Sequence, residues 1–425
     1  MAERADRGQR RAVRHNWLIL GGAFATFALA MALMQSYPVF LLAYIEAFGW
    51  SRAETSVAFS VAQLVAGMGS PLVGALVDRL GPRRLMLLGG ALLMLGAAGN
   101  SAVSALWQVV VLYGVVMTTG ASCLGLVVFA PLLSRHFVRR RGMAVAILQS
   151  ANGFGRAVAT PSAQLLISGF GWRGAYLAEG ALVAVLLLPL ASLFRRPEPE
   201  SGHAALAPAS AAAAAARPPS ASWSLAQAAK TREFWLLFAV YLFTGIGSFL
   251  VSLHQLAFAV SMGFDKLYAA GVLGFGAALS VIGIIFIGSL SDYIGRELAA
   301  LFSYAVSILG TLCALFISGP HDGVLLWLFS SLFGLTWGAR GPAITAKTAD
   351  LFPGRQLGRI LGVITIGSGI GSALGALSAG VIFDLSGSYR LAFILSIAAY
   401  CCGGLALWVL RRPRRSAPAR DGGCR

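Results

Sequence analysis

The chain has 425 residues, of which 57% are hydrophobic and only 12% are charged, and its formal net charge is +17. Because soluble domains carry roughly 25% charged residues, this composition excludes a protein with much soluble mass and indicates a membrane protein. The five cysteines show neither metal-ligand spacing nor a disulfide pattern, so we expect no metal and no cofactor.

Twelve apolar runs follow one another along the chain. They lie at about 17–44, 53–77, 85–105, 107–133, 143–168, 173–194, 234–260, 267–291, 298–317, 324–346, 358–383 and 391–410. Each is long enough to cross a hydrocarbon core about 30 Å thick, and the first is too long for a cleavable signal peptide. The sequence predicts an all-α membrane protein with twelve transmembrane helices in two six-helix bundles, embedded in a lipid bilayer.

The basic residues predict the topology. If the N-terminus is cytoplasmic, nearly all of the 33 lysines and arginines fall on the inner side, and the outer loops carry only Arg52, Arg173, Lys266 and Arg390. This asymmetry predicts that both termini are cytoplasmic. The positive charge is thereby explained without a nucleic-acid partner, and we expect none.

Residues 195–230 are rich in Pro and Ala, with almost no large apolar side chain to bury, which is typical of a linker. The expected organisation is a basic cytoplasmic N-terminus at 1–16, a bundle at 17–194, a cytoplasmic linker at 195–230, a second bundle at 231–410 and a basic tail at 411–425. We expect the protein to be a monomer.

The two bundles carry copies of the same patterns. GALVDRLGPRR at Gly74–Arg84 returns as GSLSDYIGRE at Gly288–Glu297, and the glycine pattern at Gly153–Gly155 returns at Gly369–Gly371. The chain is therefore a duplication of one long unit. A duplicated membrane unit usually encloses something between its halves.

The first repeated pattern also predicts a gate. Asp78 ends the second run, where it can accept hydrogen bonds from Arg79, Arg83 or a neighbouring helix N-terminus. Such a network would close the inner side in one state and break in the other. The second copy keeps Asp292 and Arg296 but lacks the first arginine. A plain positive inner loop with a helix-end aspartate is the alternative.

Two six-run halves with this loop motif after the second and eighth runs resemble the major facilitator superfamily, over nearly the whole chain. The resemblance implies a carrier whose two rigid bundles rock about a central site. A finer resemblance is carried by Phe48–Glu54, Gly171–Tyr176 and His254. These residues resemble the monocarboxylate-transporter branch, including its bacterial members and the related oxalate exchanger.

Two arginines lie deep inside apolar runs, where a charge costs roughly 2.5–3.5 kcal/mol. Arg156 shares one face of the fifth run with Gln149 and Asn152, which predicts a wet cavity there. Arg340 lies in the tenth run, and Trp337 one turn earlier is expected on the same face. A guanidinium fork matches a carboxylate, and an aromatic ring can cover the apolar part of a small acid.

Both arginines have structural alternatives. Arg156 can pair with Glu179 in the sixth run, and Arg340 can pair with a backbone carbonyl or with Asp350. Glu179 alone cannot neutralise two arginines, so the imbalance predicts an anion that arrives from outside the protein.

The sequence departs from the monocarboxylate branch in one respect. The resemblance implies an aspartate and an arginine in the eighth run, where Ser280 and Ile284 stand, and a lysine in the first run, which offers Gln35 and Tyr37 instead. The binding charges would then be the two relocated arginines. Tyr37 beside a kinking proline is a further binding candidate.

These features predict a secondary active transporter of small organic anions, of monocarboxylate type and proton-coupled, in a bacterial inner membrane. Glu179 and His254 are the proton-coupling candidates, and His254 is also a candidate for substrate binding. An efflux carrier for amphipathic drugs or metabolites and a non-transporting sensor are the alternatives. No metal cluster, phosphate loop or Ser/His/Asp arrangement points to an enzyme.

Overall fold

The computed structural model describes residues 2–137, 141–193, 223–354 and 356–411, and their regular structure is helical. The first half contains α1 (Ala2–Gln35), α2 (Tyr37–Phe48), α3 (Arg52–Leu80), α4 (Pro82–Asn100), α5 (Leu106–Val109), the π-helix η1 (Val110–Met117), α6 (Thr118–Ser122), α7 (Leu126–His136) and α8 (Arg141–Leu193). Most of the linker predicted at 195–230 and all but the first residue of the tail predicted at 411–425 lie outside the described residues.

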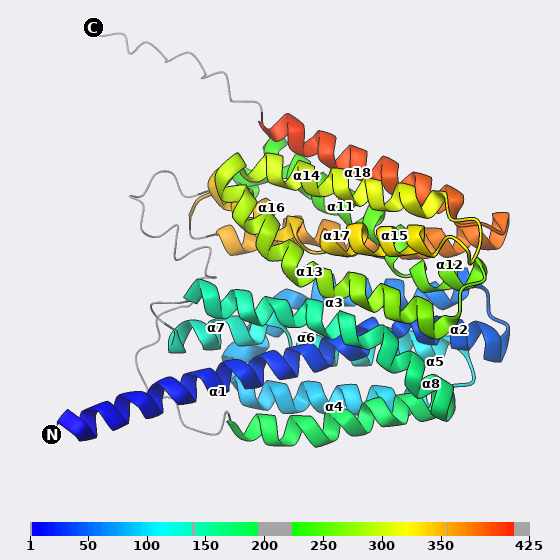
Figure 1. The fold of residues 1–425 in the computed structure, drawn as a ribbon. Coiled ribbons are helices and arrows are strands. Elements are labelled where there is room, and N and C mark those ends of the chain that lie inside the picture. Colours follow the sequence, from blue (N-terminus) through cyan, green and yellow to red (C-terminus); the bar gives the residue numbers. More distant parts are fainter. Residues whose placement is uncertain (1, 138–140, 194–222, 355, 412–425) are drawn as a thin grey trace, which may run out of the picture.

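The second half continues with a short helix and eight longer segments. They are α10 (Leu225–Ala228), α11 (Arg232–Ser252), α12 (Gln255–Ser261), α13 (Lys266–Ile294), α14 (Arg296–Leu315), α15 (Gly323–Leu335), α16 (Arg340–Leu351), α17 (Leu357–Ser386) and α18 (Arg390–Arg411). Figure 1 shows the two halves as stacked bundles, with α1 beginning and α18 ending at the same end of the molecule. We call the opposite end, where α2 ends and α3 begins, the far end.

The bundles meet along two helix pairs, α3 with α17 and α8 with α13. The repeated motifs relate α3 to α13 and α8 to α17, so the two pairs are equivalent by the duplication. Glycines end the motif-bearing helices in the same way. Gly81 follows α3 with φ 76° and ψ 159°, and Gly295 follows α13 with φ 90° and ψ 152°.

Helix α8 contains two of the predicted runs. Its backbone leaves the helical region at Gly171, whose φ of 68° favours glycine, and Figure 1 shows the chain turning back there toward the end where α1 begins. The equivalent turn between α17 and α18 is at Gly387, with φ 69°. Both turns lie at the far end, which confirms the duplicated architecture at the level of the backbone.

Eight helical segments in the described residues are long and apolar enough to cross a membrane. The predicted runs at 53–77, 85–105 and 324–346, which fall in α3, α4 and α15–α16, are not among the eight, and α8 is a single segment although it holds two runs. Twelve spans and cytoplasmic termini therefore stay predictions.

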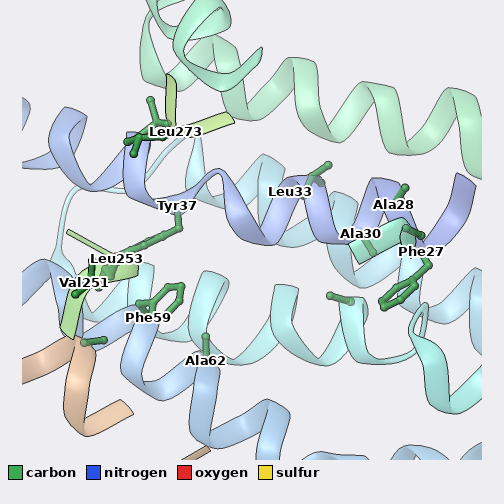
Figure 2. Close-up of a cluster of buried hydrophobic side chains, with 14 of the residues drawn as sticks. Phe27, Ala28, Ala30, Leu33, Tyr37, Phe59, Ala62, Val251, Leu253 and Leu273 are labelled. Carbon is green, nitrogen blue, oxygen red and sulfur yellow. The ribbon is translucent and has the colours of Figure 1, made fainter. Parts of the chain in front are cut away.

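One large apolar cluster holds both bundles together. Figure 2 shows part of it, with Tyr37 and Phe59 from the first half and Val251 and Leu253 from the second. All four side chains are at most 4% exposed. The core is therefore continuous across the bundle interface, and polar groups buried within this cluster are shielded from bulk water.

Candidate functional site

Arg156 lies where the two bundles meet. Its side chain is 7% exposed, and its Cζ is 3.8 Å from the centroid of the Trp337 ring, which belongs to the other half. Nη1 of Arg156 is buried and has no hydrogen-bond partner among the described residues. A guanidinium over an indole face is a favourable cation–π arrangement, but it does not replace a missing acceptor.

Glycine lets α8 carry this arginine into the interface. A Cβ on Gly155 would lie 2.5 Å from the carbonyl oxygen of Ala28 and 2.9 Å from the Cβ of Met31, so α8 and α1 touch at backbone distance beside Arg156. Gln149 and Asn152, which sequence periodicity predicts on the Arg156 face, are both half-buried. Their polar groups thus belong to the same stretch of α8.

Trp337 connects Arg156 to a row of aromatic rings. Its ring centroid is 5.2 Å from that of Phe249 on α11, and Phe249 is 5.5 Å from Phe59 on α3. The row therefore crosses the interface twice, because Arg156 and Phe59 come from the first half and the two rings between them come from the second.

Phe59 also lines a hollow of about 260 Å³ inside the first bundle. The lining residues are Met31, Met34, Gln35, Phe59, Ala62, Gln63, Ala66, Val73, Tyr113, Thr118, Ala121, Ser122, Gly125 and Val127. None of them is charged. Sequence reasoning singled out Gln35 but missed Gln63, whose amide in the middle of the 53–77 run was the available signal.

The prediction that Trp337 and Arg340 share one helical face is wrong. The helix stops at Leu335 and restarts at Arg340, and Gly338 between them has a φ of 75°, which sends the chain out of helical geometry. Trp337 consequently faces Arg156, whereas Arg340 contacts residues of its own bundle.

Arg340 is buried in the second bundle, at 4% exposure. Its Nη2 donates to Ser307 Oγ at 2.8 Å, and its Cζ lies 4.7 Å from the ring centroids of both Tyr304 and Tyr400. Nη1 is buried without a hydrogen-bond partner in the described part of the chain. Arg340 and Arg156 therefore contact different aromatic rings, and the described contacts of Arg340 come from its own half.

The acidic alternatives for these arginines are placed elsewhere. Asp350 pairs with Arg296 at the cytoplasmic end predicted for α14, so the described residues do not show it on Arg340. Glu179 is 6% exposed, and its Oε2 is buried with no hydrogen-bond partner among the described residues. The described ion pairs do not join Glu179 to Arg156.

Tyr37 and His254, the other candidates, are fully buried and hydrogen-bonded. The Tyr37 hydroxyl donates to the Thr55 carbonyl at 2.6 Å, at the break between α1 and α2 that Pro38 predicts. His254 bridges the halves at the far end: Nε2 lies 3.1 Å from Ser56 Oγ, and Nδ1 lies 3.2 Å from the Tyr389 hydroxyl. In the described part of the chain, neither residue contacts the unpartnered Nη1 atom of Arg156 or Arg340, and each joins two elements through its hydrogen bonds.

The predicted inner gate is described only in part. The side chains of Asp78 and Asp292 lie outside the described residues. Arg79 is exposed, and Nε of Arg83 is buried without a hydrogen-bond partner in what the structure describes. Arg296 donates to the Ala346 carbonyl at 2.7 Å, in addition to its ion pair with Asp350. The gate stays a prediction, with Asp350 as a partner that the motif did not indicate.

Comparison with known proteins identifies the family. The model of the Major Facilitator Superfamily matches residues 20–346 and 332–423. The chain is 27% identical over 398 residues to monocarboxylate transporter 13 of Rattus norvegicus, covering 93% of this chain and 88% of that protein. It is 26% identical to the MFS-type transporter YcxA of Bacillus subtilis, covering 90% and 92%.

A solved structure agrees with the fold. A mutant of the nucleoside transporter NupG matches with a TM-score of 0.75 at 13% sequence identity, over 94% of this chain and 100% of that one. These relatives are transporters and not enzymes. The chain belongs to the Major Facilitator Superfamily and is a membrane transporter of that family.

Proposed function

We propose that this transporter carries small organic anions of monocarboxylate type, with a proton, by alternating access between its two bundles. The observation that carries the proposal is Arg156, a buried guanidinium in the bundle interface whose Nη1 has no hydrogen-bond partner in the described residues. A carboxylate would supply the missing acceptor and the compensating charge. We expect the carrier to act as a monomer in a bacterial inner membrane.

The aromatic row beside Arg156 suits an acid with an apolar part. Trp337 covers one face of the guanidinium and leaves the nitrogen edge for a carboxylate. The row from Trp337 through Phe249 ends at Phe59, which lines the uncharged hollow, so an apolar body of a bound acid would meet aromatic rings on this side of Arg156. Arg340 is the second candidate charge, since its Nη1 also lacks a described partner.

Proton coupling is supported by Glu179. A buried carboxyl with an unpartnered oxygen is costly as an anion, so a proton that travels with the substrate would make both Glu179 and the loaded site less charged. The name of monocarboxylate transporter 13 agrees with an acid substrate. Ser280 stands where the resemblance to the monocarboxylate branch implies an aspartate, and its hydroxyl donates to the Ala277 carbonyl of its own helix. This part of the eighth run therefore supplies no charge for a substrate.

Uptake into proteoliposomes tests the proposal. The parent is assayed with labelled lactate, pyruvate, longer aliphatic acids and aromatic acids, with and without an inward proton gradient. We expect Arg156→Gln to abolish the saturable uptake of every accepted acid. Arg173→Gln is the matched control, because Arg173 also lies over an indole, 4.1 Å from the Trp172 ring, but is exposed at the far end.

Two results would contradict the proposal. Full uptake by Arg156→Gln would remove the binding role of Arg156, and no uptake of any acid by the folded parent would remove the substrate class. The uncharged hollow and Glu179 favour one other candidate, an efflux carrier for amphipathic compounds. A drug-resistance phenotype that survives Arg156→Gln would support that carrier instead.

A further inference from the structure

At the far end, the first turn of α3 is capped by a carboxylate from the other bundle. The backbone N–H of Arg52 donates to Asp384 Oδ1 at 3.1 Å, and that of Ala53 donates to Asp384 Oδ2 at 2.8 Å. Asp384 lies near the end of α17, so these two hydrogen bonds exist only while α3 and α17 are in contact.

Helix α3 also has a cap of its own. Ser51 Oγ accepts from the Glu54 N–H at 3.1 Å, and Glu54 Oε2 accepts from the Ser51 N–H at 2.8 Å. The first amides of a helix have no partner inside it and carry partial positive charge, so a carboxylate there is favourable. One turn therefore has two carboxylates, Glu54 from its own helix and Asp384 from the opposite half.

The residues next to this cap pack the start of α3 closely against α17. The Arg52 guanidinium lies with Cζ 3.3 Å from the centroid of the Phe383 ring, the residue before Asp384. A Cβ on Gly380 would lie 2.7 Å from the Arg52 carbonyl oxygen, so only glycine permits this approach. Two charge-assisted hydrogen bonds, a cation–π contact and backbone packing thus coincide at one point.

The contact continues from this point into the membrane region. Ser56 lies 3.1 Å from His254 Nε2, which also lies 3.1 Å from the Ala376 carbonyl oxygen, and Ser60 Oγ donates to the Ala373 carbonyl at 2.8 Å. Asp384 therefore stands at the solvent-exposed end of a polar seam between the bundles, where water first enters when they part.

We infer that Asp384 is a removable cap that holds the far end closed, and that its release from α3 is a required step in opening this end. Because Ser51 and Glu54 remain on α3 when the bundles separate, the helix keeps its own cap and stays folded. Because the site is exposed, water replaces the lost partners, which keeps release reversible. The inference concerns the seam alone and goes beyond the choice of substrate.

Hydrogen–deuterium exchange of the full-length protein tests it. In Asp384→Asn we expect exchange to rise about tenfold along the whole seam, in peptides over 52–62 and over 371–384, because the lost charge weakens both capping bonds. Glu54→Gln is the matched control: it removes a carboxylate from the same helix turn without touching α17, so its effect stays within 51–55.

Maleimide labelling gives a second measurement. In a background with the native cysteines replaced, Ser56→Cys is buried in the seam, and its labelling should accelerate about tenfold with Asp384→Asn and remain slow with Glu54→Gln. The inference is overturned if both carboxylate variants change only the first turn of α3, or if Asp384→Asn leaves labelling unchanged while thermal unfolding shows an intact protein.

Discussion

The two helix pairs that join the bundles are related by duplication but are built differently. The α3–α17 pair is polar, with Asp384 on the start of α3 and the Ser60 hydroxyl bonded across to Ala373. Both pairs approach closely at glycines, but the described α8–α13 contact adds no hydrogen bond between the bundles: a Cβ on Gly153 would lie 2.7 Å from Ser280 Oγ, and a Cβ on Gly274 would lie 2.8 Å from the Ala157 carbonyl oxygen.

This difference assigns the two contacts different roles in a rocking carrier. Directional hydrogen bonds hold one geometry and break as a set, so α3–α17 suits a latch. Small residues let helices approach closely with smooth surfaces, so α8–α13 suits a bearing that stays in contact while the bundles tilt. A duplicated unit therefore need not use its two equivalent contacts in the same way.

The strongest way to break the comparison is to add one methyl group to each contact. In Gly380→Ala, the new Cβ would lie 2.7–2.9 Å from backbone atoms of Arg52 and Ala53, which cannot turn away. We expect a loss of about 3 kcal/mol in stability, at the upper end for overpacking, and a clearly lower melting temperature.

The equivalent change in the other contact should be milder. In Gly153→Ala, the new Cβ would lie 2.7 Å from the side-chain atoms Ser280 Oγ and Val281 Cγ2, so side chains and not backbone must shift. Gly271→Ala is the control, because a Cβ there meets nothing within 4 Å. Equal losses in Gly380→Ala and Gly153→Ala would contradict the distinction between latch and bearing.

The next prediction concerns His254 and distinguishes a role in the α3–α17 latch from a role in substrate binding. His254→Phe removes the ring nitrogens that bond Ser56 and Tyr389, and the two hydroxyls lose a partner in a buried place. We expect a loss of about 2 kcal/mol, seen as a lower melting temperature, because unsatisfied buried groups are costly. The affinity for the transported acid, measured by thermal shift against ligand concentration, should stay unchanged.

A different result for His254→Phe would support a role of His254 in substrate binding. If His254→Phe keeps the parent melting temperature but weakens acid binding tenfold or more, the histidine contacts substrate and does not mainly join the bundles. The same titration on Arg156→Gln provides the reference for a true loss of binding.

The polar seam was beyond sequence reasoning, whereas the architecture was not. Hydropathy and the repeated motifs predicted the two related halves, because both depend on local patterns. In the sequence, Asp384 is an ordinary charged residue near a helix end. It caps α3 only because the tertiary fold brings the backbone N–H groups of Arg52 and Ala53 next to it.

The candidate site shows the same limit. Periodicity predicts one polar face around Arg156, and α8 runs unbroken through that stretch, but the wet cavity expected there stays a prediction. The prediction of one shared face failed for Trp337 and Arg340 because Gly338 interrupts the helix with a positive φ. The sequence alone does not indicate this φ, since a glycine inside an apolar run can also be helical. Pairing of Arg296 with Asp350 was missed because the two come from different helices.

A smaller effect compares two buried serines, one in each contact. Ser60 donates across the interface to Ala373, whereas Ser280 donates to Ala277 within α13. We expect Ser60→Ala to cost about 1 kcal/mol and to raise exchange in α17, because the Ala373 carbonyl loses its donor across the seam. Ser280→Ala should leave exchange in α8 unchanged, and a rise there would show that the bearing also depends on hydrogen bonds.

The smallest effect concerns an ion pair between α2 and α13. Lys266 Nζ lies 2.5 Å from Glu46 Oε1 and links the two halves at the far end, but the side chains are 40% and 56% exposed. Exposed pairs contribute about 0.5 kcal/mol and are screened by salt. We therefore expect Lys266→Gln to speed the labelling of Ser56→Cys less than twofold at low salt and not at all at high salt. A salt-independent increase as large as that of Asp384→Asn would mean that the latch is a distributed charge network, in which Asp384 has no special place.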